Sequence, residues 1–239
     1  AQQAGAQIHG NTAALSVHEQ PDGTYLVKTP HGCIRADRLI VANNGYASDN
    51  LPDWMGGRYL PVVSHIMVTR TLSETEKQAQ GWTTRRISYD TRNLLHYFRL
   101  LPDDRMLFGM RGTNNLTPGS TKPMRARIRR DFEKMFPGLA SAETEFHWSG
   151  LICLTRALVP YAGPIGEWKN AWTGMAYHGT GVAMATYTGR LLAGLAADRA
   201  YASPLPRLMR DMPRVFPLPR LRRRYLPAAY ALYGLLDRF

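Results

Sequence analysis

The chain has 239 residues, 44% apolar and 20% charged, which is the composition of a globular protein and excludes a disordered one. No apolar run reaches the ~18–20 residues that cross a bilayer, and the N-terminus lacks the basic and apolar regions of a signal peptide. The net charge of +12 is concentrated in the stretch from Arg207 to Arg224, which has seven arginines and one acid, so no nucleic-acid partner is predicted.

The two cysteines, Cys33 and Cys153, are far apart and form no CxxC pair. A disulfide scaffold is therefore not expected, and a reducing, cytoplasmic location is predicted. The histidines form no HxxxH or HExxH pair, so no metal site is expected. The chain opens on Ala1 rather than on Met, which indicates a polypeptide that begins within a longer protein.

Residues 6–42 are predicted to form a β-meander with turns at Pro21-Asp22-Gly23 and His31-Gly32. Its last strand, Arg38–Ala42, is a short apolar run that ends at Asn43-Asn44-Gly45, as a buried strand does before a tight loop. In isolation, that loop is equally well explained as a plain turn.

Longer strands are predicted between residues 61 and 112, including a hairpin over 93–111 that turns at residues 102–104. Strand side chains alternate, so Tyr97 and Arg99 share one face of this hairpin. Two interpretations remain open for that face: it lines a polar ligand cavity, or it is an ordinary solvated surface.

Residues 121–136 are predicted to form a helix capped by Thr121, with Pro123 in its first turn and Pro137-Gly138 ending it. Apolar residues repeat along it at helical spacing, and the arginines on its other face are interpreted as solvated.

The strongest local signal is a strand over 172–177 that runs through His178-Gly179-Thr180-Gly181 into a helix predicted to end near Arg199. Glycines at such a junction let a ligand approach the backbone, and a helix N-terminus offers unpaired N–H donors. Met184 stands where a dinucleotide fingerprint would have its third glycine, so this is not a pyrophosphate loop. A tight structural turn and a seat for the electron-rich edge of a flavin ring both remain possible interpretations.

Taken together, the motifs resemble the FAD-dependent oxidoreductases of the D-amino-acid oxidase, glycine oxidase and sarcosine oxidase type, with the γ-glutamylputrescine oxidase-like branch closest. The resemblance covers the whole chain and depends on the order and spacing of several pieces. These pieces are GAQIHGNTAALSV, ADRLIVANNGYAS, HYFRLLPDDRMLFGMRG, FPGL, HWSGLICLTRALVPYAGPIG and GMAYHGTGVAMATYTGRLLA.

The resemblance implies an α+β chain, α/β in the intact enzyme, in which an incomplete FAD-binding domain is interleaved with an antiparallel-sheet substrate domain. The FAD-binding parts are expected at 1–50 and 151–203, the substrate domain with one helix at 51–150, and a basic helical tail at 204–239. The family's N-terminal GxGxxG unit is absent from the sequence. The chain is therefore expected to be a C-terminal fragment whose partner is the missing N-terminal segment.

The resemblance also implies site residues. The cofactor-binding positions are Ala14, Ala42, Asn43, Asn44, Gly45, Gly174, Tyr177, His178, Gly179, Thr180, Gly181 and Val182. The substrate-binding positions are Tyr97, Arg99 and Arg111, and no catalytic base is named because a neutral amine can donate hydride directly. Arg156 stands where relatives often carry an acidic or polar residue, so its role is left open.

The implied activity is oxidation of the C–N bond of an amine or amino acid by hydride transfer to FAD. Two alternatives remain: a flavin dehydrogenase that passes electrons to a quinone or carrier, and a basic module that binds a membrane surface or acidic partner. The second depends on the arginine-rich tail, which either packs on its own protein or makes peripheral contact with the inner membrane face.

Overall fold

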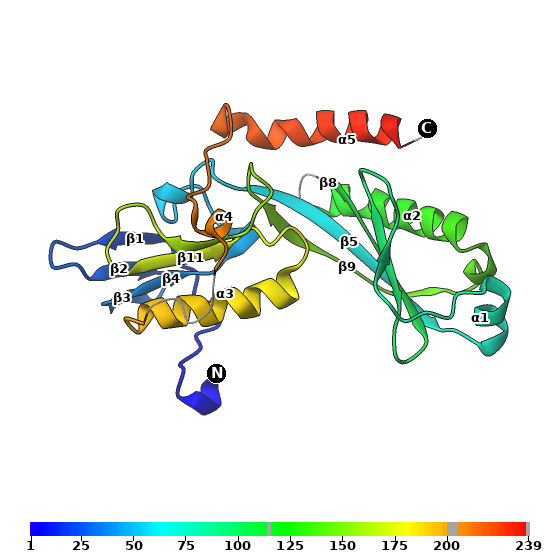
Figure 1. Cartoon of the computed structure of the whole chain (residues 1–239), viewed down its shortest axis with the longest axis horizontal. Coiled ribbons are helices and arrows are strands. Elements are labelled where there is room, and N and C mark those ends of the chain that lie inside the picture. Colours follow the sequence, from blue (N-terminus) through cyan, green and yellow to red (C-terminus); the bar gives the residue numbers. More distant parts are fainter. Residues whose placement is uncertain (114–115, 200–204, 238–239) are drawn as a thin grey trace. The chain divides into compact units, whose positions relative to one another are not determined.

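The computed structural model describes residues 1–113, 116–199 and 205–237. The chain divides into two compact units, and each is described by itself. Unit 1 comprises Ala1–Leu60 and Cys153–Arg220, and unit 2 comprises Pro61–Ile152 and Leu221–Phe239. The chain passes from one unit to the other in the long strands β5 (Leu60–Thr71) and β9 (Thr144–Leu154) (Figure 1) and again between Arg220 and Leu221.

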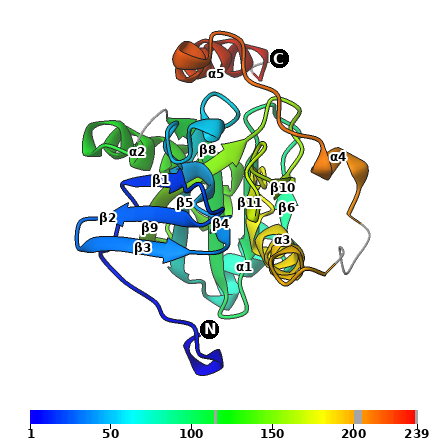
Figure 2. The same ribbon diagram turned by 90° about the vertical axis from the view of Figure 1, so that its left-hand side faces the viewer.

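Unit 1 contains two three-stranded sheets (Figure 2). The first is an antiparallel meander of β1 (Ser16–Glu19), β2 (Tyr25–Thr29) and β3 (Gly32–Ala36). The second has the order β10-β11-β4, built from β10 (Tyr161–Pro164), β11 (Ala171–Met175) and β4 (Leu39–Val41). In this second sheet β11 runs antiparallel to β10 and parallel to β4.

Helix α3 (Gly181–Ala196) lies along β11 and β10 (Figure 1). Its buried Leu191 joins Ala162 of β10 and two residues of the C-terminal segment, Leu205 and Met209, in one apolar cluster. The short helix α4 (Arg207–Arg210) therefore packs on the body of unit 1. Single 3-10 turns occur in unit 1 at Gln2–Ala4, Asn44–Tyr46 and Asp53–Met55 and in unit 2 at Pro137–Leu139, and a longer 3-10 helix, Pro219–Arg224, spans the boundary between the units.

Unit 2 is a five-stranded antiparallel sheet of order β6-β7-β8-β5-β9. The strands not yet placed are β6 (Ser88–Tyr89), β7 (His96–Leu100) and β8 (Arg105–Thr113), and the helices are α1 (Glu74–Gln80), α2 (Pro118–Met135) and α5 (Tyr225–Leu236). Helix α2 covers one face of the sheet and encloses an aromatic core. Phe98, Phe108, Phe132 and Phe136 pack ring against ring in this core, with Trp82 at its edge.

The mixed α/β character and the antiparallel sheets agree with the sequence-based expectation, as does the hairpin formed by β7 and β8. Three local expectations were wrong. Residues 6–14 form no strand, because they are largely exposed; the pairing with β2 begins at Leu15, whose N–H donates to the Lys28 carbonyl at 2.7 Å. Residues 39–41 leave the meander and pair with β11.

The third correction concerns the ends of two helices. Helix α2 begins at Pro118 after the N-cap Thr117, because a proline at the first position needs no N–H partner there, so Thr121 lies inside the helix. Helix α3 ends at Ala196, before Arg199.

The segment expected as one basic tail contributes to both units, and its residues 204, 238 and 239 lie outside the described residues. In the parts of the chain that the structure describes, every helix is too short or too polar to cross a membrane.

Candidate functional site

Two loops that are far apart in sequence leave the same edge of a sheet in unit 1. Strands β4 and β11 are parallel, with Leu39 opposite Ala171 and Val41 opposite Thr173. The Thr173 hydroxyl donates to the Val41 carbonyl at 2.8 Å, which holds the two strand ends in register. The loops 42–46 and 176–180 follow directly, and the carboxyl ends of parallel strands are where open α/β sheets bind ligands.

A side chain joins the two loops. The Asn44 side-chain oxygen Oδ1 accepts a hydrogen bond from the Ala176 backbone N–H at 2.9 Å, and Asn44 takes a left-handed φ of 47° to reach it. Beside it, Oδ1 of Asn43 is buried and has no hydrogen-bond partner among the described residues. Because a buried acceptor without a donor is costly, this atom marks a place where a further polar group fits.

The backbone between β11 and α3 adopts unusual conformations. Ala176 and His178 have φ values of 63° and 55°, and Gly179 has φ 109°. Left-handed backbone costs roughly 1–2 kcal/mol per non-glycine residue, and such costs persist mainly at binding sites that the surrounding fold holds in place.

Contacts of Tyr177 keep this backbone segment in place. Its hydroxyl bonds to the Thr188 hydroxyl at 2.9 Å, and its carbonyl accepts from the Thr180 N–H at 2.9 Å. A Cβ added at Gly174 would lie only 3.0 Å from the Tyr177 hydroxyl, so glycine permits this close packing. Burial raises the pKa of Tyr177 against the opposing effect of the Thr188 hydrogen bond, so the phenol stays protonated.

The N-terminus of α3 is open. The N-cap residue Thr180 donates its hydroxyl back to the Tyr177 carbonyl at 2.7 Å and makes no capping bond to the helix. Val182 in the first turn is 94% exposed, and a Cβ on Gly179 would meet nothing within 4 Å. The first-turn N–H groups and the positive end of the helix dipole are therefore available to an electron-rich group.

The predicted substrate residues lie in unit 2, on the sheet face away from α2. Tyr97 pairs with Gly109, and its ring lies so close over that glycine that an added Cβ would be 2.1 Å from Cζ. The Tyr97 hydroxyl bonds to Ser64 Oγ at 2.7 Å. Burial raises the pKa of Tyr97, while the Ser64 hydrogen bond and the positive charge of Arg111 oppose that rise.

The remaining predicted residues are placed differently. Arg99 donates from Nε to the Arg85 carbonyl at 3.2 Å. Ala14 is exposed and precedes β1, on a sheet different from the one that carries the two loops. Arg156 is exposed in the loop after β9.

Sequence reasoning missed three residues that neighbour the predicted positions: Thr188 behind Tyr177, Ser64 beside Tyr97, and Tyr230, whose buried hydroxyl lies within the electrostatic reach of Arg111. No local motif marks these residues, because their neighbours come from other elements.

A parallel pair of strands whose loops meet beside an open helix N-terminus defines a nucleotide- or cofactor-binding α/β protein. Residues 1–195 match the family model described as FAD dependent oxidoreductase, and the chain belongs to this family.

The matched curated relatives align with a larger share of this chain than the share of their own length that this chain spans. It is 31% identical over 236 residues to "Probable oxidoreductase OrdL" of Rhizobium meliloti (strain 1021), which covers 99% of this chain and 53% of the relative. It is 27% identical to the "Gamma-glutamylputrescine oxidoreductase" of Escherichia coli (strain K12) over 71% of this chain and 39% of that protein. The chain thus spans about half the length, or less, of these relatives.

Among solved structures, glycine oxidase from Geobacillus kaustophilus superposes with a TM-score of 0.71 at 17% identity, covering 90% of this chain and 55% of that one. At this identity the likeness shows the fold alone. The family's cofactor is FAD. The residues of unit 1 fit such a group, because the uncapped start of α3 and the buried Asn43 oxygen provide donors and an acceptor without partners of their own.

Proposed function

We propose that this chain supplies the flavin-ring loop and the substrate-facing sheet of an enzyme that oxidises the C–N bond of an amine or amino acid. The observation that carries the proposal is the Asn44–Ala176 hydrogen bond, which brings the two predicted cofactor loops together beside the open N-terminus of α3. The chemistry that bound FAD supplies is acceptance of a hydride from the carbon next to an amine nitrogen.

In this proposal the first-turn N–H groups of α3, from Gly181 and Val182, donate to the electron-rich edge of the flavin ring. The left-handed backbone at His178 and Gly179 lets the ring approach the main chain without meeting a side chain. Asn43 and Asn44, with Gly45, would lie beside the cofactor's sugar and phosphate portion. Ala14, Ala42 and Gly174 complete the proposed set, with Ala14 the least supported because it lies outside the strands and precedes β1, which belongs to the other sheet.

Substrate recognition is proposed at Tyr97 and Arg111 on unit 2. The guanidinium of Arg111 gives this face of the sheet a positive charge that matches an acidic group on the substrate. Ser64 fixes the Tyr97 hydroxyl, so that the phenol is held in one orientation. Arg99 is retained as a more distant contributor, since its side chain bonds to Arg85.

The helix dipole provides a direct test. In the FAD-loaded whole enzyme, Val182→Asp would place a carboxylate at the proposed flavin edge and lower the two-electron midpoint potential by about 30 mV or more, which is tenfold in the redox equilibrium. Leu208→Asp is the matched control, because Leu208 is also exposed, at 68%, but lies on α4. Equal potentials in the two variants would contradict the proposed position of the ring.

Two further measurements complete the test. The purified 239-residue chain is expected to bind FAD weakly, since it lacks a GxGxxG phosphate cradle, and its flavin absorbance reports this. In the whole enzyme, oxygen consumption with peroxide release during amine turnover distinguishes an oxidase from a dehydrogenase that uses a quinone or carrier.

A further inference from the structure

Helix α5 is attached to unit 2 by one face. Leu226 is buried, and the Tyr230 hydroxyl is buried beneath the helix. After the helix, Asp237 accepts hydrogen bonds from the backbone N–H groups of Asn93 at 2.8 Å and Leu94 at 2.9 Å. These contacts fix which side of α5 faces outward.

The outward side is apolar. Leu232, Leu235 and Leu236 are 55%, 52% and 52% exposed, and their spacing places them together on one face. Ala228 and Ala231 extend this face by one turn and are also exposed. A helix face turned to water is normally polar, yet residues 225–236 contain no charged side chain. This outer face therefore has the composition of a surface that becomes covered.

Arginines stand at the start of the same helix. Arg223 and Arg224 are exposed directly before Tyr225, and Leu221 beside them is 41% exposed. Between Asp211 and Asp237 the sequence has five arginines and no acidic residue. The apolar face is thus flanked by positive charge that no neighbouring acid in this segment offsets.

We infer that the outer face of α5, together with Arg223 and Arg224, docks on an anionic lipid surface. An apolar helix face with arginines at its end matches a bilayer interface, where leucines enter the acyl boundary and guanidinium groups meet lipid phosphates. Twelve residues of helix span about 18 Å, too short to cross a bilayer, so the helix lies in the plane of the surface.

Two other occupants are outcomes of the test, a further part of the enzyme and a second copy of the chain. A second copy of the chain would cover the leucines but would bring its own arginines to the contact. An anionic lipid surface would both cover the exposed leucines and offset the charge of the arginines.

The test is co-sedimentation of the 239-residue chain with vesicles of phosphatidylcholine, alone or with about one third phosphatidylserine. Binding is expected on the anionic vesicles, weak binding on the neutral ones, and loss of binding as salt rises above physiological strength. Arg223→Gln/Arg224→Gln should lower the partition coefficient about 30-fold, against little change for the charge-matched control Arg86→Gln/Arg130→Gln.

Leu232→Glu/Leu235→Glu should abolish binding, while Leu208→Glu on α4 serves as the control for an exposed leucine. Circular dichroism establishes that each variant is folded. Binding that is equal on both vesicle types, or absent from both, would overturn the inference. A dimer in sedimentation equilibrium that Leu232→Glu dissociates would also overturn it, because a second copy would then be the occupant.

Discussion

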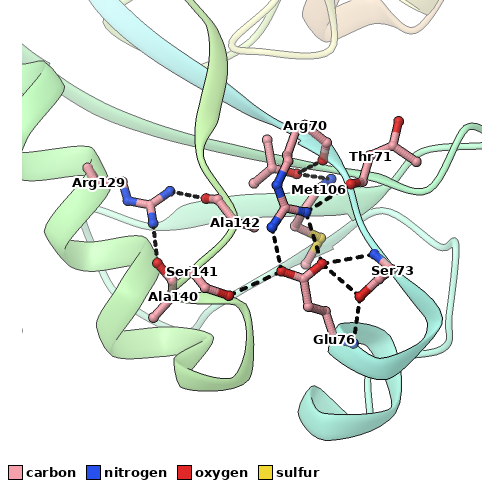
Figure 3. Close-up of polar contacts among 10 residues, drawn as sticks. Arg70, Thr71, Ser73, Glu76, Met106, Arg129, Ala140, Ser141 and Ala142 are labelled. Carbon is pink, nitrogen blue, oxygen red and sulfur yellow. Dashed lines mark hydrogen bonds and ion pairs between the residues drawn. The ribbon is translucent and has the colours of Figure 1, made fainter.

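The carboxylate of Glu76 in unit 2 is bonded on every side, whereas the first-turn N–H groups of α3 in unit 1 receive no side-chain cap. Both Glu76 oxygens accept from Arg70, at 2.8 and 2.9 Å, and further bonds come from Ser73 and Ser141 (Figure 3). At the start of α3, Thr180 instead turns its hydroxyl back to Tyr177.

This contrast separates two uses of polar groups. The saturated cluster around Glu76 ties α1 to β5 and to the turn after α2, so it contributes to stability. The open donors and the left-handed backbone in unit 1 cost stability, and they mark the place where a ligand is expected. Variants at these two places should therefore differ in kind: those in the Glu76 cluster change unfolding, and those at the start of α3 change binding.

The largest effect is expected in the aromatic core of unit 2. Phe108 is fully buried and packs against the rings of Phe132 and Phe136. Phe108→Ala should lower the free energy of unfolding by about 3–5 kcal/mol, because the cavity that it leaves cannot collapse. Urea denaturation measures the change, and Ile87→Ala, at a position 71% exposed, should stay within about 0.5 kcal/mol of the parent chain.

A pH-dependent loss of stability is expected from His65, a buried histidine of unit 2. Burial, with the neighbouring His147 ring as a second cause, lowers the pKa of His65 to about 4. The unfolded chain binds the proton first, so stability is full above pH 6.5 and falls as the pH drops from 6.5 towards 4. The loss should be on the order of 3 kcal/mol, and His65→Gln should flatten this part of the stability curve.

In His18→Gln, a change at an exposed position, the free energy of unfolding should fall between pH 6.5 and pH 4 with the same slope as in the parent chain. An unchanged slope in His65→Gln would show that other groups produce the acid sensitivity.

A substitution in the Glu76 cluster should lower the free energy of unfolding by less, because Arg70 is partly exposed. The Arg70 hydrogen bond, followed by the Ser73 backbone bond, lowers the pKa of Glu76 from 4.5 to about 2. The stabilisation that the ionised Glu76 carboxylate gives the folded chain is therefore present above pH 4.5 and is lost as the pH falls towards 2. Glu76→Gln should cost about 1–2 kcal/mol at neutral pH. Glu74→Gln in the same helix, with a side chain 76% exposed, is the matched control, and an equal cost there would contradict the assignment.

The smallest effect on stability is expected in unit 1. Tyr177→Phe removes the hydrogen bond to Thr188, but the Thr188 hydroxyl still donates to the Met184 carbonyl at 2.8 Å. The cost should be about 0.5–1.5 kcal/mol in urea denaturation, compared with Tyr89→Phe at an exposed position. A loss as large as that from Phe108→Ala would mean that the two units do not differ in the way proposed.

Sequence reasoning reached the parts of the site that local chemistry specifies. The hairpin of β7 and β8 follows from alternating side chains and a Pro-Asp-Asp turn, and the loop before α3 follows from its glycines. It failed at residues 6–14, where partial alternation indicated a strand but the pairing with β2 begins only at Leu15. It also did not find Ser64, Thr188 or Tyr230, because their roles depend on neighbours from other elements.

The sequence by itself determined the family, the hairpin, the glycine loop and the helical character of the C-terminal tail, since each depends on residues close together in the chain. Only the tertiary structure decided that β4 pairs with β11 and that Asn44 bonds to Ala176 across 132 positions. Parallel strands are joined by long connections and leave no turn signal between them, so their pairing is settled by packing over the whole unit. The outward direction of the α5 leucines was decided in the same way, by the contacts of Leu226 and Asp237 on the opposite side of the chain's last helix.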